Sequence, residues 1–241
     1  GCYVMDRIEG EVLAPRILRE EAYAGARKTM ARQCGEILAG LHAVDPASLP
    51  KNLVQMPVKA LIAYYRELLD GISAFYRDNT KVGRPEYHPA FELTFRWLEQ
   101  NMPTNAPSGM VHGDFRNGNF VVGPEGIRAV LDWELGHVGD GMEDLGWLCV
   151  RAWRFGQHDK PVGGFGERED LFAGYENAGG RKVDPKVVHF WEVLGTLKWG
   201  IICMFQAYKH LSGLIDSFEH MAIGRRACEN EIDLLKLIEE A

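Results

Sequence analysis

The sequence predicts an α+β protein that is mainly α-helical, with a β-hairpin near the middle of the chain. Two observations predict this fold class. Apolar residues recur at helical spacing through most of the chain. Two apolar runs, residues 120–122 and 127–131, are separated by Gly-Pro-Glu-Gly, which is typical of a hairpin with a four-residue loop. The 241 residues, 46% of them apolar, are enough to bury a core without disulfides or a structural metal.

The first part of the chain predicts one strand and three helices. Residues 3–8 are short, apolar and β-rich, which predicts a strand. A helical pattern then occupies residues 20–42 and ends before Asp45-Pro46. Two further amphipathic helices are expected at residues 57–77 and 89–101.

The part after the hairpin predicts four more helices. The first starts after Asp140, with Asp140 and Glu143 as a capping pair. The others are expected at residues 168–176, 185–211 and 217–240. The third helix is apolar nearly all round and therefore buried. His189, Glu192 and Lys198 interrupt its apolar stretch, so we expect it to be too polar for a membrane span.

Composition excludes several function classes. With 27 basic and 34 acidic residues the net charge is −7, which disfavours nucleic acid as a partner. The five cysteines are widely spaced and form no C-x-x-C, so we expect free thiols in a reducing cytoplasm. We expect no signal peptide and no membrane partner. No pattern in the sequence indicates its oligomeric state.

The segment 111–147 carries the chemistry. It reads V-H-G-D-F-R-N-G-N-F-V-V, then the hairpin loop, then V-L-D-W-E and G-D-G-M-E-D-L-G-W. Phosphoryl transfer needs an oriented nucleophile and neutralised negative charge. Asp114, in a loop before a strand, can hold and deprotonate a hydroxyl. Asn119 and Asp132 flank the hairpin at one end, and their oxygens suit Mg²⁺.

These residues resemble a known family. The pattern H-G-D-x-x-x-x-N, followed by a hairpin and D-W-E, resembles the aminoglycoside phosphotransferase and choline kinase group. Protein kinases have H-R-D-x-x-x-x-N and D-F-G at the same places. The stretches G-D-x-x-x-D-L at 139–145 and L-A-G-L-H-A-V-D at 38–45 also resemble this group. The resemblance implies a protein-kinase-like fold, with this chain forming mainly the helical carboxy-terminal lobe.

The resemblance implies roles for individual residues. Asp114 is the catalytic base, and Arg116 lies near the transferred phosphate. Asn119 and Asp132 bind Mg²⁺. ATP is the phosphoryl donor, and a small-molecule hydroxyl is the acceptor. The remaining residues would surround the adenine, with backbone groups at its edge, a side chain behind it and two side chains beneath it: Met5, Asp6, Ile8, Val121 and Leu131.

The sequence contains no counterpart to three parts of the family's nucleotide site: the loop that binds the phosphates, the strand lysine and the helix glutamate. We therefore interpret residues 1–10 as a hinge strand from an amino-terminal lobe that is largely absent. Residues 11–241 are interpreted as the catalytic and substrate-binding lobe. The 241-residue chain alone is expected to turn over almost no ATP, and robust turnover would contradict this interpretation.

Several alternatives stay open at this stage. His112 is either a ligand or base, or a structural residue that forms hydrogen bonds within the loop. Glu134 is either a third metal ligand, or a residue that supports the metal ligands or faces the substrate. Asp144 either acts in the site or anchors loop backbone groups. The whole protein is either an enzyme or a non-catalytic pseudokinase that binds small molecules; a lysine-bearing strand upstream would favour the enzyme. A protein kinase proper is disfavoured, because no D-F-G to A-P-E segment follows Asp132.

Overall fold

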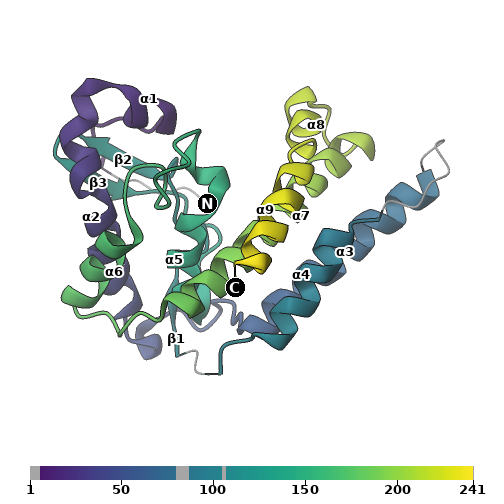
Figure 1. Cartoon of the computed structure of the whole chain (residues 1–241), viewed down its shortest axis with the longest axis horizontal. Coiled ribbons are helices and arrows are strands. Elements are labelled where there is room, and N and C mark those ends of the chain that lie inside the picture. Colours follow the sequence, from purple (N-terminus) through teal and green to yellow (C-terminus); the bar gives the residue numbers. More distant parts are fainter. Residues whose placement is uncertain (1–5, 80–86, 105–106, 241) are drawn as a thin grey trace. The chain divides into compact units, whose positions relative to one another are not determined.

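The computed structural model describes residues 6–79, 87–104 and 107–240. The chain divides into two compact units (Figure 1). Unit 1 comprises residues 1–55 and 107–188, and unit 2 comprises residues 56–106 and 189–241. The expected boundary at residue 10 stays a prediction. Unit 1 contains the whole segment that the sequence singles out for chemistry.

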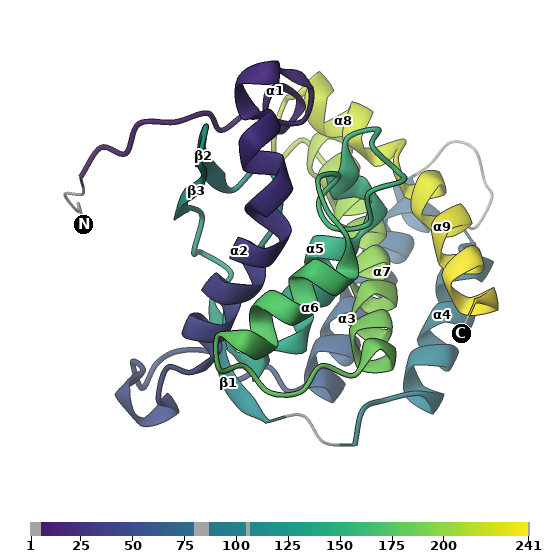
Figure 2. The ribbon, with the colours of Figure 1, turned by 60° about the vertical axis from the view of Figure 1, so that its left-hand side comes forward.

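The helices of unit 1 are built around one long helix. Helix α1 (Ala14–Arg19) and a 3-10 turn (Glu21–Tyr23) lead into α2 (Ala24–His42), and a second 3-10 turn (Pro46–Ser48) follows. Met30, Cys34 and Leu38, spaced four residues apart, are fully buried along α2. Helix α6 (Arg168–Asn177) packs beside α2 (Figure 2), where glycines in both helices let the backbones approach closely.

The described part of unit 1 contains two small antiparallel sheets. Strand β1 (Ser108–Val111) pairs with β4 (His137–Asp140), and β2 (Phe120–Gly123) pairs with β3 (Gly126–Val130). The predicted hairpin is confirmed, but its loop is shorter than expected. Gly123 pairs with Gly126, so only two residues form the turn. The sheet of β1 and β4 was not predicted, because each strand is four residues long and its partner is distant in sequence.

The predicted strand at residues 3–8 is not found in its described part. Residues 1–5 lie outside the described residues, and residues 6–8 belong to no strand. Backbone pairing begins later, where Glu11 and Val122 exchange two N–H···O bonds of 2.9 Å. A strand needs a neighbour to satisfy its backbone groups, and from residue 6 onward this segment meets β2 at Glu11.

Helix α5 (Met142–Cys149) starts two residues after Asp140. The N-cap residue is Gly141, so the prediction of Asp140 as N-cap is wrong by one residue. The carboxylate of Asp140, one residue before the cap, still accepts a hydrogen bond from the backbone N–H of Met142 at 3.1 Å. The predicted reciprocal contact is wrong, because the carboxylate of Glu143 lies 3.1 Å from His137 instead. A 3-10 turn (Arg151–Arg154) follows α5 and leads toward α6.

Unit 2 is helical in its described part. It contains α3 (Val58–Asn79), α4 (Pro89–Gln100), α8 (Phe218–Gly224), α9 (Ala227–Glu239) and most of α7 (Pro185–Leu211). Helix α9 packs against α4 (Figure 1). The predicted last helix is two helices, interrupted after Gly224, since glycine is a poor helix former.

Helix α7 differs from its prediction in one respect. By length and composition it is apolar enough to cross a membrane, so the expectation that it is too polar is wrong. The burial expected for it is confirmed, because 78% of its most apolar window is buried inside the protein. A buried core helix passes the same length and composition test, so α7 is weak evidence for a membrane span.

Candidate active site

The loop at residues 112–119, here named the catalytic loop, connects β1 to β2. Two glycines allow its sharp turns. Gly113 has φ +78° and Gly118 has φ +117°, values that other residues rarely adopt. A Cβ atom on Gly113 would lie 2.6 Å from the carbonyl oxygen of Leu135. The loop therefore presses against the segment that follows Asp132.

The carboxylate of Asp114 is the centre of the loop. Its Oδ1 accepts hydrogen bonds from Trp147 Nε1 at 2.8 Å and from Arg116 Nε at 3.0 Å. Its Oδ2 accepts one from Asn119 Nδ2 at 2.7 Å. The side chain is 13% exposed, so it is mostly buried but open to a ligand on one side. The structure therefore brings together three of the residues that the sequence predicts: Asp114, Arg116 and Asn119.

The amide of Asn119 has a defined orientation. Its Nδ2 donates to the carboxylate of Asp114 and also to the backbone oxygen of Asp114, at 2.9 Å. Both partners are acceptors, so the NH₂ group faces Asp114 and the amide oxygen faces away. An oxygen held in this way suits a hard cation such as Mg²⁺.

Asp132 lies at the same end of the hairpin as Asn119. The backbone N–H of Leu131 donates to the carbonyl of Asn119 at 2.8 Å, one step beyond the last paired residues of β2 and β3. Asp132 follows directly, is exposed, and has φ +66°, a value that Asp tolerates better than most residues. The described residues contain no cluster of three or more His, Cys, Asp or Glu side chains for a metal. A magnesium ion here would rely on Asn119, Asp132 and phosphate oxygens.

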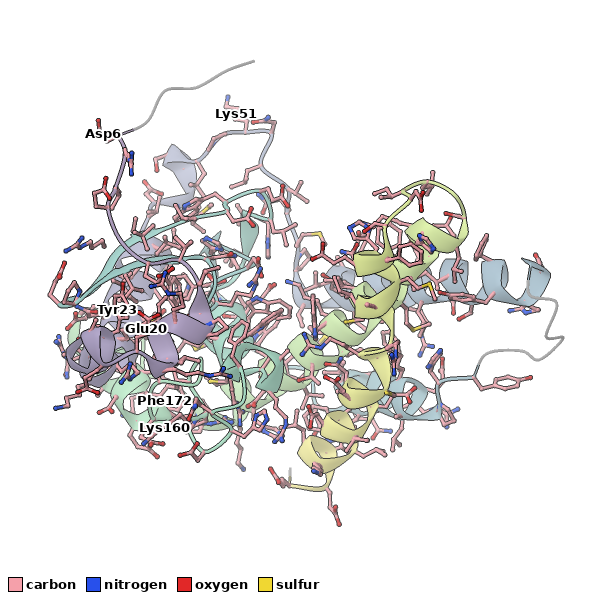
Figure 3. The ribbon with its side chains drawn as sticks, turned by 90° about the horizontal axis from the view of Figure 1, so that it is seen from above. Asp6, Glu20, Tyr23, Lys51, Lys160 and Phe172 are labelled. Atoms are coloured by element: carbon pink, nitrogen blue, oxygen red, sulfur yellow. The ribbon has the colours of Figure 1, made fainter. Side chains whose placement is uncertain are left out.

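The predicted adenine-binding residues differ in their burial and in their distance from the catalytic loop along the chain. Val121 is buried in β2, and a Cβ atom on Gly10 would lie 2.6 Å from its Cγ1, so the chain at Gly10 runs close over it. Leu131 is 38% exposed and directly precedes Asp132, at the end of the hairpin that carries the predicted metal ligands. Asp6 is exposed on the N-terminal segment (Figure 3), and Ile8 is exposed two residues later. No described contact joins either residue to the catalytic loop. Met5 lies outside the described residues.

Asp144 anchors the backbone of the catalytic loop, as one of the two alternatives for it predicts. The carboxylate is fully buried and accepts hydrogen bonds from the backbone N–H groups of His112 at 2.8 Å and Gly113 at 2.9 Å. Burial alone would raise the pKa of Asp144. The hydrogen bond and charge of His42 and the His112 N–H lower it more, so the pKa lies below its ordinary value.

His42 is a residue of this network that the sequence analysis did not assign. Its Nε2 lies 3.3 Å from the carboxylate of Asp144, and its Nδ1 lies 3.0 Å from the hydroxyl of Tyr175. His42 is the histidine of the L-A-G-L-H-A-V-D stretch, and Asp144 is the second aspartate of the G-D-x-x-x-D-L stretch. The contact therefore joins two stretches that each resemble the same family. Their common resemblance was the sequence signal that could have indicated this contact.

His112 has a structural role in this geometry. Its Nδ1 accepts a hydrogen bond from the backbone N–H of Asp114 at 3.1 Å, and its Nε2 faces the carbonyl of Leu131 at 3.1 Å. The side chain is fully buried, and both ring nitrogens are occupied in the neutral tautomer. It is therefore not placed to take a proton from a substrate.

His137 makes the stability of unit 1 dependent on pH. Its Nδ1 donates to the carbonyl of Leu135, and its Nε2 faces Glu143. Burial lowers the pKa of His137, but the hydrogen bond and charge of Glu143 and the Leu135 carbonyl raise it more, so the pKa lies above 6.5. A raised pKa stabilises the fold fully below the unfolded value, and this contribution is lost as pH rises through the folded value.

We therefore expect the free energy of unfolding to fall as pH rises above about 6.5. Replacing His137 with Gln is expected to reduce this slope, measured by urea unfolding at a series of pH values. Replacing the exposed His158 with Gln serves as the control and is expected to keep it. An unchanged slope in His137→Gln would contradict the assignment.

Comparison with known proteins agrees with this geometry. The model of the phosphotransferase enzyme family matches residues 1–181. A crystal structure from Ralstonia eutropha, assigned to the aminoglycoside phosphotransferases, superposes with a TM-score of 0.68 at 21% identity. That match covers 98% of this chain and 72% of the other, and it shows a shared fold.

Two curated proteins are also similar. Acyl-CoA dehydrogenase family member 11 of Homo sapiens is 31% identical over 150 residues, covering 59% of this chain and 18% of that protein. Homoserine kinase of Methylobacterium nodulans is 26% identical over 163 residues, covering 65% of this chain and 45% of that protein. The chain thus spans less than half the length of either curated relative. Because the family model covers more than half of the sequence and the fold agrees, the chain belongs to the phosphotransferase enzyme family, with a protein-kinase-like fold formed here by a mainly helical lobe and a small β part.

Proposed function

We propose that the protein transfers the γ-phosphoryl group of ATP to a hydroxyl group of a small molecule. The arrangement of Asp114 and Asn119 carries this proposal. One loop holds a carboxylate that can accept a proton and, hydrogen-bonded to it, an amide whose oxygen is free to face a cation. Phosphoryl transfer needs both functions side by side.

The proposed reaction is a direct transfer. The acceptor oxygen forms a bond to the γ-phosphorus, the bond from that phosphorus to the β–γ bridging oxygen breaks, and ADP leaves. The proton of the acceptor hydroxyl passes to the carboxylate of Asp114. Mg²⁺, held by Asn119 and Asp132, would neutralise charge on the phosphates. Arg116 lies 3.0 Å from Asp114, where its guanidinium can also face the transferred group.

The nucleotide is proposed to lie against the hairpin. Val121 pairs with Ala129, and Leu131 follows Ala129 by two residues, just after β3, so the two side chains can lie on the same face of the hairpin under an adenine. The backbone groups of Asp6 and Ile8, with Met5 behind the base, complete the proposed adenine site. Leu131 is exposed, whereas Val121 is buried in β2.

The names of two relatives support two acceptor classes. One relative is named a homoserine kinase, and another is named an acyl-CoA dehydrogenase family member. The first name supports the side-chain hydroxyl of a small amino acid as the acceptor, and the second supports an acyl-CoA compound, which we propose would carry a hydroxyl group. Both acceptors would present a neutral alcohol to Asp114, so the same loop serves either.

An acceptor screen with the full-length natural protein tests the proposal. ATP and Mg²⁺ are incubated with L-homoserine, choline, an aminoglycoside and a hydroxyacyl-CoA, and phosphorylated product is measured by mass spectrometry alongside ADP. Product that carries one added phosphate on a hydroxyl is expected with one acceptor class. Binding of nucleotide or acceptor without any transfer would contradict the proposal and favour the non-catalytic pseudokinase.

Replacing Asp132 with Asn tests the proposed metal site. The substitution keeps the shape of the side chain but removes its charge. We expect the Mg²⁺ concentration that gives half-maximal rate to rise about 10- to 100-fold. Glu125→Gln, at the exposed turn of the same hairpin, is the matched control and is expected to leave the Mg²⁺ requirement unchanged. An unchanged Mg²⁺ requirement in Asp132→Asn would remove Asp132 from the ligand set.

A further inference from the structure

Two buried tryptophans lie behind the catalytic loop. Trp147 is 2% exposed and Trp153 is 4% exposed, and their ring centroids are 5.0 Å apart. Tryptophans that are buried to this extent are usually ordinary core residues. The indole Nε1 of Trp147, however, donates its hydrogen bond to the carboxylate of Asp114 at 2.8 Å. A core residue thus contacts the proposed catalytic base directly.

Helix α5 contacts the catalytic loop at two separate points. Asp144 and Trp147 are three residues apart in α5, so they lie on the same face of the helix. Asp144 holds the backbone of His112 and Gly113, whereas Trp147 holds the side chain of Asp114. Asp144 therefore anchors the backbone of the loop, whereas the indole N–H of Trp147 contacts the carboxylate.

Trp153 completes a closed set of contacts around that carboxylate. The guanidinium of Arg116 lies 4.6 Å from the centre of the Trp153 ring, within the range of a cation–π interaction. Its Nε lies 3.0 and 3.2 Å from the two carboxylate oxygens of Asp114. The contacts run from Trp147 to Asp114, Arg116 and Trp153, and back to Trp147. Trp147 thus contacts the carboxylate of Asp114, and Trp153 contacts the guanidinium that pairs with it.

We propose that Trp147 is a positioning residue for phosphoryl transfer, because its indole N–H sets the rotation of the Asp114 carboxylate. This proposal rests on the proposed function. The terminal torsion of an aspartate is broad, so the carboxylate does not orient itself. Transfer of a hydroxyl proton requires a carboxylate oxygen within about 2.6–3.2 Å of the hydroxyl. Trp147 is a rigid, buried donor to Oδ1, and Asn119 donates to Oδ2, so both oxygens are held in place. A carboxylate has about four lone-pair sites, so one remains to accept the proton of the acceptor hydroxyl.

The test is Trp147→Phe in the full-length natural protein, because phenylalanine keeps an aromatic ring and removes the N–H. We expect kcat to fall about 10- to 100-fold, since small misplacement of a reacting group has effects of this size. The KM for ATP is expected to stay within about twofold, because Trp147 does not face the proposed nucleotide site. The matched control is Trp191→Phe in α7, where an equally buried indole loses the same volume. This control is expected to keep the wild-type kcat.

A second substitution separates the hydrogen bond from the packing. Benzothienylalanine at position 147 has the shape of tryptophan, with sulfur in place of the N–H. It keeps the packing of the ring, so it tests the hydrogen bond even if Trp147→Phe does not fold. We expect the same fall in kcat. Wild-type kcat with this residue, or equal falls in Trp147→Phe and Trp191→Phe, would overturn the positioning role while leaving the proposed function intact. Absence of transfer by the wild-type protein would instead overturn the proposed function, and this proposal with it.

Discussion

Replacing Asp114 with Asn is expected to lower kcat for phosphoryl transfer by about 10²- to 10⁴-fold, the usual contribution of a positioned general base. Asn keeps the size of the side chain, and its oxygen can still accept the hydrogen bond from Trp147. It cannot take the proton of an acceptor hydroxyl, and it no longer pairs with the guanidinium of Arg116. The measurement is kcat under saturating ATP, Mg²⁺ and acceptor, on the full-length natural protein.

Two further measurements make this result specific. The KM for ATP is expected to change little, because the carboxylate acts on the acceptor rather than on the nucleotide. Asp159→Asn, at an exposed position of unit 1, is the matched control and is expected to retain wild-type kcat. If Asp114→Asn kept more than about a tenth of the wild-type kcat, the general-base role would be wrong, since such a residue contributes at least about 100-fold.

The parts of the site that could be predicted from the sequence are those that a single loop brings together. Asp114, Arg116 and Asn119 are close in sequence. Because the loop between β1 and β2 is short, these residues must also lie close together in space. The hairpin then carries Asp132 back to the same end by simple strand pairing. Local spacing therefore contained most of the information on these residues.

The parts that could not be predicted depend on packing between distant segments. His42 reaches Asp144 from the end of α2, across 102 positions of the chain. Trp147 reaches Asp114 from α5, and no local pattern distinguishes its indole from those of other buried tryptophans. The direction in which a buried side chain points is decided by the elements that surround it.

The same distinction explains the differences in the fold. Long periodic helices such as α2 and α7 were predicted closely, because their amphipathic or apolar pattern is repeated many times. The short strands β1 and β4 escaped prediction, because four residues carry little pattern. The reciprocal cap at α5 failed for a tertiary reason, since Glu143 finds His137 on β4 instead of the helix start.

Replacing Asp144 with Asn is expected to lower the free energy of unfolding by about 3 kcal/mol, because a buried carboxylate that accepts several hydrogen bonds is lost. The amide has one acceptor oxygen for the N–H groups of His112 and Gly113, and its NH₂ group cannot accept from either. Urea unfolding at pH 7 measures the change. Asp170→Asn, on the exposed surface of α6, is the matched control and is expected to unfold as the wild type does.

The pH dependence of this difference identifies its cause. The pKa of Asp144 lies below its ordinary value of 3.8, so the unfolded chain binds this proton more tightly than the folded protein does. The stabilisation is therefore fully present above about pH 4 and is lost as pH falls through the lower folded pKa. The wild type and Asp144→Asn should differ by a constant amount from pH 7 down to about pH 4 and converge below it. A gap that persisted unchanged in stronger acid would mean that the shape of the side chain, and not its charge, holds the catalytic loop.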